Sequence, residues 1–195
     1  MPRSLSLALL VAATAVHAQP SAAPPAADVQ ITAAVAPLPE VFRPDATVLG
    51  YASDRDGLVP LREGDGAFVC LADDPAVERF HVACYHRSLE PFMARGRALR
   101  AEGYAAEVDS IRYAEIDAGT LPMPDHPAAL YSLTGPPETF DAATGSISGA
   151  RPLYVVYIPF ATAASTGLPT EPVTGAPWLM FPGTPKAHIM FVPEM

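Results

Sequence analysis

Proline residues interrupt this chain along its whole length and limit how long any helix or strand can be. The sequence contains 23 prolines among 195 residues, more than twice the usual share of ~5%. Because proline lacks a backbone N–H, it breaks the interior of helices and of central strands. A coiled coil is therefore excluded, and we expect short elements separated by proline-containing turns.

The overall composition indicates a folded, acidic chain. Hydrophobic residues make up 50% of the sequence, charged residues 17%, and the formal net charge is −9. A disordered chain would combine low hydrophobicity with a high net charge per residue. A protein that binds nucleic acid would carry a basic stripe, whereas Lys186 is the only lysine here. We therefore expect no nucleic-acid partner.

The N-terminus has the three-part pattern of a secretory signal peptide, which we assign to residues 1–18. Arg3 provides the positive start, residues 5–16 are apolar, and small residues precede a cleavage site after Ala18. An uncleaved membrane anchor is the alternative, although the apolar stretch is shorter than the ~20 residues that span a bilayer. Residues 19–28 are rich in alanine and proline and predict a flexible leader. The mature chain is expected to be periplasmic or extracellular and to have no transmembrane segment.

The two cysteines, Cys70 and Cys84, are expected to form one disulfide. They are the only cysteines in the sequence, and an exported protein matures in an oxidising compartment, where such a pair becomes linked. The alternatives are a redox-active pair, which usually has a closer spacing, or thiolate ligands for a metal. The disulfide hypothesis predicts that both thiols are oxidised in the native protein.

The order of the predicted elements is strands, helices and then strands again, which favours an α+β fold over alternating β and α units. We assign residues 29–195 to a single α+β domain with a mostly antiparallel sheet and two or three helices. The first three strands, joined by turns rich in Gly and Asp, predict an antiparallel meander. The expected helices cover residues 28–36, 88–102 and 108–119. The expected strands cover residues 47–51, 58–62, 67–71, 129–133, 153–160, 177–181 and 189–192.

Four polar residues are the candidates for a metal or ligand site: His81, His86, Glu90 and His188. His86 and Glu90 are four residues apart at the expected start of a helix and could share one face. Three imidazoles and a carboxylate suit zinc or another first-row divalent metal. The alternative is structural, since histidine and glutamate are also common as capping and surface residues at helix starts. We therefore expect no cofactor, with zinc or another first-row divalent metal as the alternative.

His188 lies in an apolar strand near the C-terminus, where its ring nitrogens need hydrogen-bond partners. It is either a hydrogen-bonded core histidine or a residue at the mouth of an apolar pocket. The candidate lining residues for such a pocket are Trp178, Met180, Phe181 and Met190, and the alternative is that they form part of the core. The arginines of the 88–102 helix, Arg95, Arg97 and Arg100, are expected on its solvated side.

Three segments together resemble a group of small exported bacterial proteins of unassigned function. They are the strand at residues 68–71, the second cysteine Cys84, and the C-terminal segment 180–190 with its Gly-Thr-Pro-x-Ala-His pattern. The resemblance spans most of the mature chain and implies a bacterial origin and an exported location. It implies no reaction and transfers no catalytic residues.

Two functions are compatible with these patterns. The first is a non-enzymatic module of the cell envelope or its surroundings that binds a small molecule or a protein. The second is a metal-assisted, hydrolase-like enzyme that uses the His/Glu cluster. The spacing characteristic of a nucleophile elbow, a dinucleotide-binding loop or a zincin helix does not occur in the sequence. The second function requires the four candidate donors to meet at one point.

Overall fold

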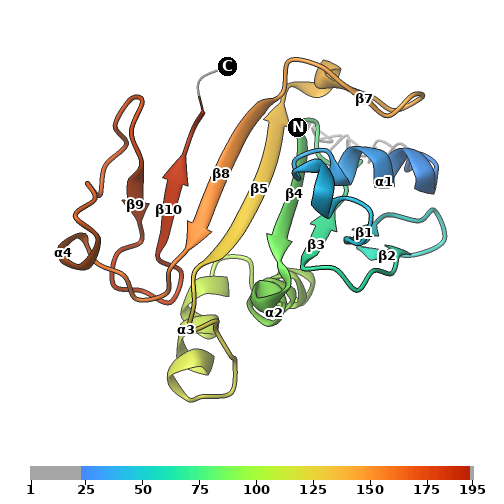
Figure 1. Ribbon diagram of the computed structural model, residues 1–195. Helices are drawn as coiled ribbons and strands as arrows, with labels where there is room; N and C mark the ends of the chain where they lie inside the picture. Colours follow the sequence, from blue (N-terminus) through green and yellow to red (C-terminus); the bar gives the residue numbers. More distant parts are fainter. Residues whose placement is uncertain (1–22, 194–195) are drawn as a thin grey trace, which may run out of the picture.

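The computed structural model describes residues 23–193, which form an eight-stranded sheet with helices on both of its faces (Figure 1). The strand order is β2-β1-β3-β4-β5-β8-β10-β9, and a small hairpin of β6 and β7 stands apart from it. The expected α+β fold with a mostly antiparallel sheet is confirmed. The helical elements are α1 (Ala27–Val35), η1 (Glu40–Phe42), η2 (Arg87–Leu89), α2 (Glu90–Ala101), α3 (Val108–Asp117), η3 (Pro137–Thr139) and α4 (Ala163–Thr166). The strands are β1 (Thr47–Gly50), β2 (Val59–Arg62), β3 (Phe68–Leu71), β4 (Phe80–His86), β5 (Ala128–Gly135), β6 (Phe140–Asp141), β7 (Ser146–Ile147), β8 (Arg151–Tyr157), β9 (Trp178–Met180) and β10 (His188–Phe191).

The expected signal peptide, residues 1–18, lies outside the described residues, as does the first part of the expected leader. Helix α1 begins at Ala27, so the last two residues assigned to the leader are helical. Within residues 23–193, every helix is too short or too polar to cross a bilayer.

The first three strands do not form the expected meander. β1 pairs with β2 in antiparallel fashion, but β3 adds to the other side of β1 and runs parallel to it. The segment between β2 and β3 therefore crosses back over the start of β1 instead of making a hairpin turn. Gly64 and Gly66 permit this crossing, because a Cβ atom on Gly64 would lie 2.3 Å from the carbonyl oxygen of Asp45. The amide of Gly66 donates a hydrogen bond to that same oxygen.

Strand β4 lies near the middle of the sheet, although the sequence analysis assigned no strand there. It pairs with β3 on one side and β5 on the other. Side chains alternate between the two faces of a strand, so Phe80, Val82 and Cys84 point to one face and His81 to the other. Because β4 is covered on both faces for much of its length, it lacks the simple alternation of polar and apolar residues that marks a half-exposed strand.

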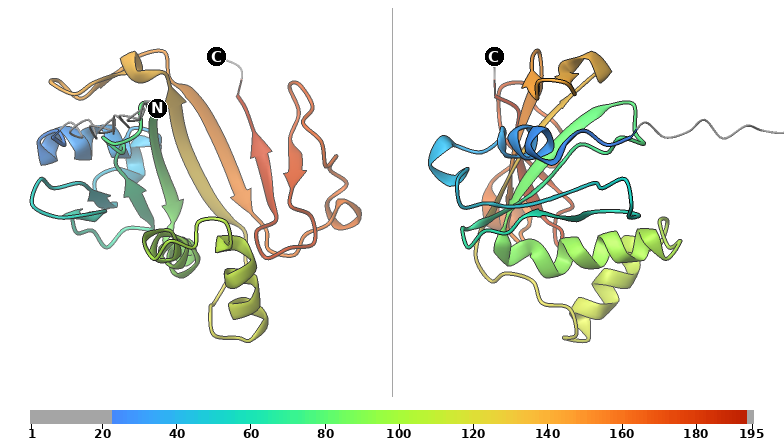
Figure 2. Two further views of the ribbon diagram at one scale, coloured as in Figure 1. Left: turned by 180° about the vertical axis from the view of Figure 1, so that it is seen from behind. Right: turned by 90° about the vertical axis from the view of Figure 1, so that its right-hand side faces the viewer.

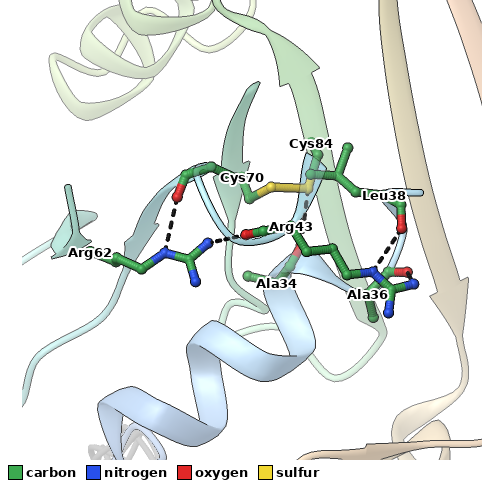
Figure 3. Close-up of a disulfide and its surroundings, with 8 residues drawn as sticks. Ala34, Ala36, Leu38, Arg43, Arg62, Cys70 and Cys84 are labelled. Carbon is green, nitrogen blue, oxygen red and sulfur yellow. Dashed lines mark hydrogen bonds between the residues drawn. A yellow bond between two sulfur atoms is a disulfide. The ribbon is translucent and has the colours of Figure 1, made fainter. Parts of the chain in front are cut away.

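The disulfide between Cys70 and Cys84 joins β3 and β4 at directly paired positions, which confirms the expected link (Figure 3). Both residues are fully buried. The sulfur of Cys84 lies 3.1 Å from the carbonyl oxygen of Ala34 at the end of α1. Two arginines bind backbone carbonyls nearby: Arg43 donates to the oxygens of Leu38 and Ala36, and Arg62 to those of Ala46 and Arg43. The cross-link therefore sits in a closely packed region beneath α1.

Two hydrophobic clusters, one on each face of the sheet, form the core. Helix α1 covers the first face, where Leu38, Val48 and Phe68 pack around the disulfide. Helices α2 and α3 lie at one end of the central strands (Figures 1 and 2). Leu89 of η2 and Phe92 of α2 pack against the second face. We call the first the α1 face and the second the α2 face.

Candidate functional site

The structure does not bring the four candidate metal donors together. His86 lies on the α1 face next to Phe68, whereas His188 packs against Tyr157, a core residue of the α2 face. Strand β10 is also three strands away from β4, which corresponds to about 14 Å. His81 is on the α2 face but at the start of β4, the end of the strand away from α2. Within residues 23–193, no group of three or more His, Cys, Asp or Glu side chains could hold a metal ion.

The sequence spacing predicted that His86 and Glu90 share a helix face, but in the structure they do not. His86 is the last residue of β4, and α2 begins only at Glu90. The spacing of four residues therefore spans a change from strand to helix, where the rule for helix faces does not apply. The ring of His86 accepts a hydrogen bond from the amide of Ser88 and so caps the turn that leads into α2. Burial lowers the pKa of His86, and the nearby His126 and Arg87 lower it further.

His188 has the features of a hydrogen-bonded core histidine. Its side chain is buried, and its Nδ1 lies 2.8 Å from the carbonyl oxygen of Lys186. Because a carbonyl can only accept, Nδ1 carries the proton and Nε2 the lone pair. Burial lowers the pKa of His188, the positive charge of Lys186 lowers it further, and the bond to the carbonyl opposes both effects.

The four expected pocket residues are spread over three environments. Trp178, Met180 and Met190 share the α2 face of β9 and β10, and Met190 packs against the core there. Trp178 also lines a cavity of about 440 Å³ formed mainly by residues 172–176 and 192–193. Phe181 follows β9 and is 40% exposed, with Lys186 over its ring. The structure thus places these residues beside one another without forming one pocket from all four.

A different site lies on the α2 face, in a cleft between α2, α3 and the sheet. It encloses a cavity of about 220 Å³, and we call it the basic cleft because four of the chain's twelve lysine and arginine residues line it. Apolar side chains and two tyrosines make up the remaining lining. The lining residues are Arg97, Arg100, Arg112, Lys186, Tyr85, Tyr157, Leu71, Ala83, Phe92, Met93 and Leu130.

One wall of the basic cleft is a hydrogen-bonded triad of Tyr85, Glu90 and Arg97. The hydroxyl of Tyr85 donates to one carboxylate oxygen of Glu90, and Arg97 donates to the other at 2.7 Å. Arg97 also donates to the Tyr85 hydroxyl at 2.8 Å. Burial and the bond to Glu90 raise the pKa of Tyr85 in spite of Arg97. The triad therefore holds the phenol protonated and fixes the position of the Arg97 guanidinium.

Arg112 is the most deeply placed charge of the cleft, with only 5% of its side chain exposed. Its guanidinium lies over the ring of Phe92, with Cζ 3.6 Å from the ring centre, and donates to the Phe92 carbonyl. It also pairs with Asp109. Its Nε is buried and has no hydrogen-bond partner among residues 23–193. Gly96 makes this position possible, because a Cβ atom there would lie 2.9 Å from Nη1 of Arg112.

Lys186 closes the side of the cleft opposite α2. Its Nζ lies 2.7 Å from Asp109, which thus bridges Lys186 and Arg112. Burial raises the pKa of Asp109, but the hydrogen bonds from Lys186 and Arg112 outweigh it and leave the pKa below its ordinary value. Burial also raises the pKa of Tyr157 to about 12, so its hydroxyl keeps its proton at neutral pH.

Arg100 retains most of its hydrogen-bonding capacity. It donates to the carbonyl oxygen of Gly96 in its own helix, and within residues 23–193 it takes part in no ion pair. A guanidinium has five donor hydrogens, so several are free to bind a ligand. Arg43 and Arg62 differ, because their guanidinium groups bind backbone carbonyls.

The charges of the basic cleft favour an anion. Its four cations are opposed by two carboxylates, Glu90 and Asp109, so the local balance is positive in a chain whose formal charge is −9. Arginine donors suit carboxylate and phosphate groups, which they bind through paired, charge-assisted hydrogen bonds. The hydroxyl of Tyr157 supplies a neutral donor beside them, whereas the proton of Tyr85 is already donated to Glu90. The arrangement can therefore bind and orient a small anionic group.

The basic cleft was not predicted from the sequence, where Arg95, Arg97 and Arg100 were expected on the solvated side of their helix. Arg100 is exposed, as expected, whereas Arg97 is only partly exposed and turns toward the cleft. The spacing contains a signal that could have corrected this. Residues 93, 97 and 100 follow the pattern i, i+4, i+7 and thus share one helix face, which the apolar side chain of Met93 marks as a face that can pack against the protein. The convergence of Arg112 and Lys186 on that face depends on tertiary structure.

Comparisons of this chain with protein-family models, with curated protein sequences and with solved structures find no match.

Proposed function

We propose that this chain is an exported binding protein for a small organic anion, which it holds in the basic cleft. The proposal is supported above all by Arg112, a buried cation whose Nε has no partner in the described part of the chain. Retaining a buried charge is costly unless it is paired and hydrogen-bonded. Asp109 is the counter-charge of Arg112, but it also binds Lys186. A negatively charged ligand oxygen in the cleft would supply a second counter-charge.

The apolar floor of the cleft supports an organic anion over an inorganic one. Leu71, Ala83 and Leu130 line the cleft from three neighbouring strands. Ligand sites commonly combine such apolar walls with a few polar groups that fix orientation. We therefore expect a carboxylate or phosphate group attached to a carbon skeleton.

Calorimetric titration of the purified protein at low ionic strength tests the proposal. The probes are hexanoate, benzoate and inorganic phosphate, which separate carboxylate from phosphate recognition. Arg100→Gln and Lys186→Gln should each weaken the binding of the best probe about tenfold, as expected for the loss of one charge-assisted hydrogen bond. Arg55→Gln is the matched control, since Arg55 is exposed in a turn and does not line the cleft.

The same titration, repeated at increasing salt concentrations, provides a second test. Binding to the cleft should weaken as ionic strength rises, because added salt screens the attraction between a ligand anion and the cleft cations. If none of the three probes binds, or if Arg55→Gln reduces binding as much as the cleft variants do, the proposal is wrong.

A further inference from the structure

A second cavity lies next to the basic cleft on the same face of the sheet. Leu71 and Ala83 line both cavities. The second has a volume of about 240 Å³ and lies toward the start of β4, next to Tyr51 and His81. Each cavity is smaller than the ~300 Å³ at which typical ligand pockets begin, whereas the two together fall within that range. Ala83, whose side chain is small, stands at the boundary between the two cavities, which we call the passage.

The second cavity is largely apolar. Leu58, Leu71, Ala72 and Val77 contribute to its walls, together with Ala83. Its charged residues are Asp73, Asp74 and Arg79, so it lacks the excess of cations found in the basic cleft. The two carboxylates would repel a second anionic group at this end.

We infer, on the basis of the proposed function, that the ligand is an amphiphile with one anionic head and one unbranched apolar chain. The head binds the cations of the basic cleft. The chain passes over Leu71 and Ala83 and ends in the second cavity. From Tyr85 to His81 the strand β4 advances by four residues, or about 13 Å, so the combined site accommodates a chain of medium length.

A series of alkyl carboxylates tests this inference by calorimetry. Butyrate, hexanoate and octanoate present the same head with increasing chain length. Each methylene that becomes buried should tighten binding about fourfold. Octanedioate has the same chain as octanoate but carries a second carboxylate at its far end. We expect it to bind at least tenfold more weakly than octanoate, because that carboxylate would meet the apolar walls and Asp73.

Two substitutions locate the chain in the second cavity. Ala83→Leu fills the passage and should reduce the advantage of octanoate over butyrate, while butyrate binding stays within about twofold of the native value. Val77→Glu places a charge in the second cavity and should have the same selective effect. Because Val77 is 53% exposed, this variant is expected to fold even if Ala83→Leu does not. Val41→Glu is the matched control, since Val41 is 75% exposed and lines neither cavity.

The outcomes separate this inference from the proposed function. Selective loss of octanoate binding in Val77→Glu, and in Ala83→Leu where that variant folds, but not in Val41→Glu, supports the inference. Equal affinities for butyrate and octanoate, or long-chain binding unaffected by Val77→Glu, would overturn it while leaving anion binding intact. If neither phosphate nor any of the carboxylates binds, the proposed function itself is wrong, and the inference that rests on it is wrong as well.

Discussion

Arg112 shows at the scale of one residue how the structure and the proposed site depend on each other. Its guanidinium links α3 to α2 through the Phe92 carbonyl and to the C-terminal loop through Asp109 and Lys186. Because Gly96 is the residue that leaves space for this guanidinium, the packing of α2 on α3 and the charge of the cleft have a common origin.

Replacement of Arg112 by methionine should lower the free energy of unfolding by about 2 kcal/mol. This is less than the 3–5 kcal/mol typical when one partner of a buried ion pair is removed, because Asp109 is 42% exposed and keeps Lys186. Urea denaturation measures the change. Arg95→Met is the control, since the Arg95–Glu115 pair is more exposed and its loss should cost much less. Equal losses in the two variants would contradict this account of Arg112.

The buried His188 should make stability depend on pH in mildly acidic solution. Burial holds its pKa below the ordinary value of 6.5, so below that pH the unfolded chain binds a proton that the folded chain does not. The stability is therefore fully present above about pH 6.5 and falls as the pH decreases below it. His81 and His86 also have lowered pKa values, so His188→Gln should remove part of the decline.

The comparison is made by urea denaturation at pH 7.5 and pH 5.0. The native protein should lose more stability between these two values than His188→Gln does. An identical loss in both proteins would show that His188 is not protonated differently in the folded and unfolded states.

At the scale of elements, local sequence signals predicted helices and edge strands better than they predicted strand order. The helices expected at residues 28–36 and 88–102 lie near the observed bounds of α1 and α2. The parallel pairing of β1 and β3 was missed because it depends on contacts between Gly64, Gly66 and the distant Asp45 backbone. Strand β4 was missed because burial on both faces removes the alternation that identifies a strand.

The link between β3 and β4 should be both stabilising and protected from reductants. A double Cys70→Ala, Cys84→Ala variant should lose about 3 kcal/mol of stability, the usual effect of a disulfide that closes a loop of about 15 residues. Because both sulfurs are buried, a reductant can reach them only after the sheet opens. Timed treatment with dithiothreitol, followed by alkylation with iodoacetamide and mass spectrometry, should therefore detect reduced cysteines quickly in urea and slowly in native buffer. Rapid reduction of the disulfide in the native protein would contradict the burial of its two sulfurs.

For the whole molecule, the main feature is an uneven distribution of charge on an acidic chain. The sequence supplied the net charge and the fold class, but not the site, because the cleft cations come from α2, α3 and the loop before β10. Of the candidate histidines, His86 lies on the α1 face of the sheet, whereas His81 and His188 lie on the α2 face on separate strands. For the cleft cations and for the histidines alike, the order of the strands and helices in space determines which side chains lie close together.

The most direct test of anion binding in the basic cleft is a titration of the arginine Nε–H resonances by ¹⁵N–¹H NMR spectroscopy. With octanoate as the probe, the signals of Arg97, Arg100 and Arg112 should shift together and saturate. The signals of Arg43 and Arg62 should stay in place, because their Nε groups donate to the backbone carbonyls of Leu38 and Ala46. Saturable shifts confined to arginines outside the cleft, or no shifts at any arginine, would contradict the account.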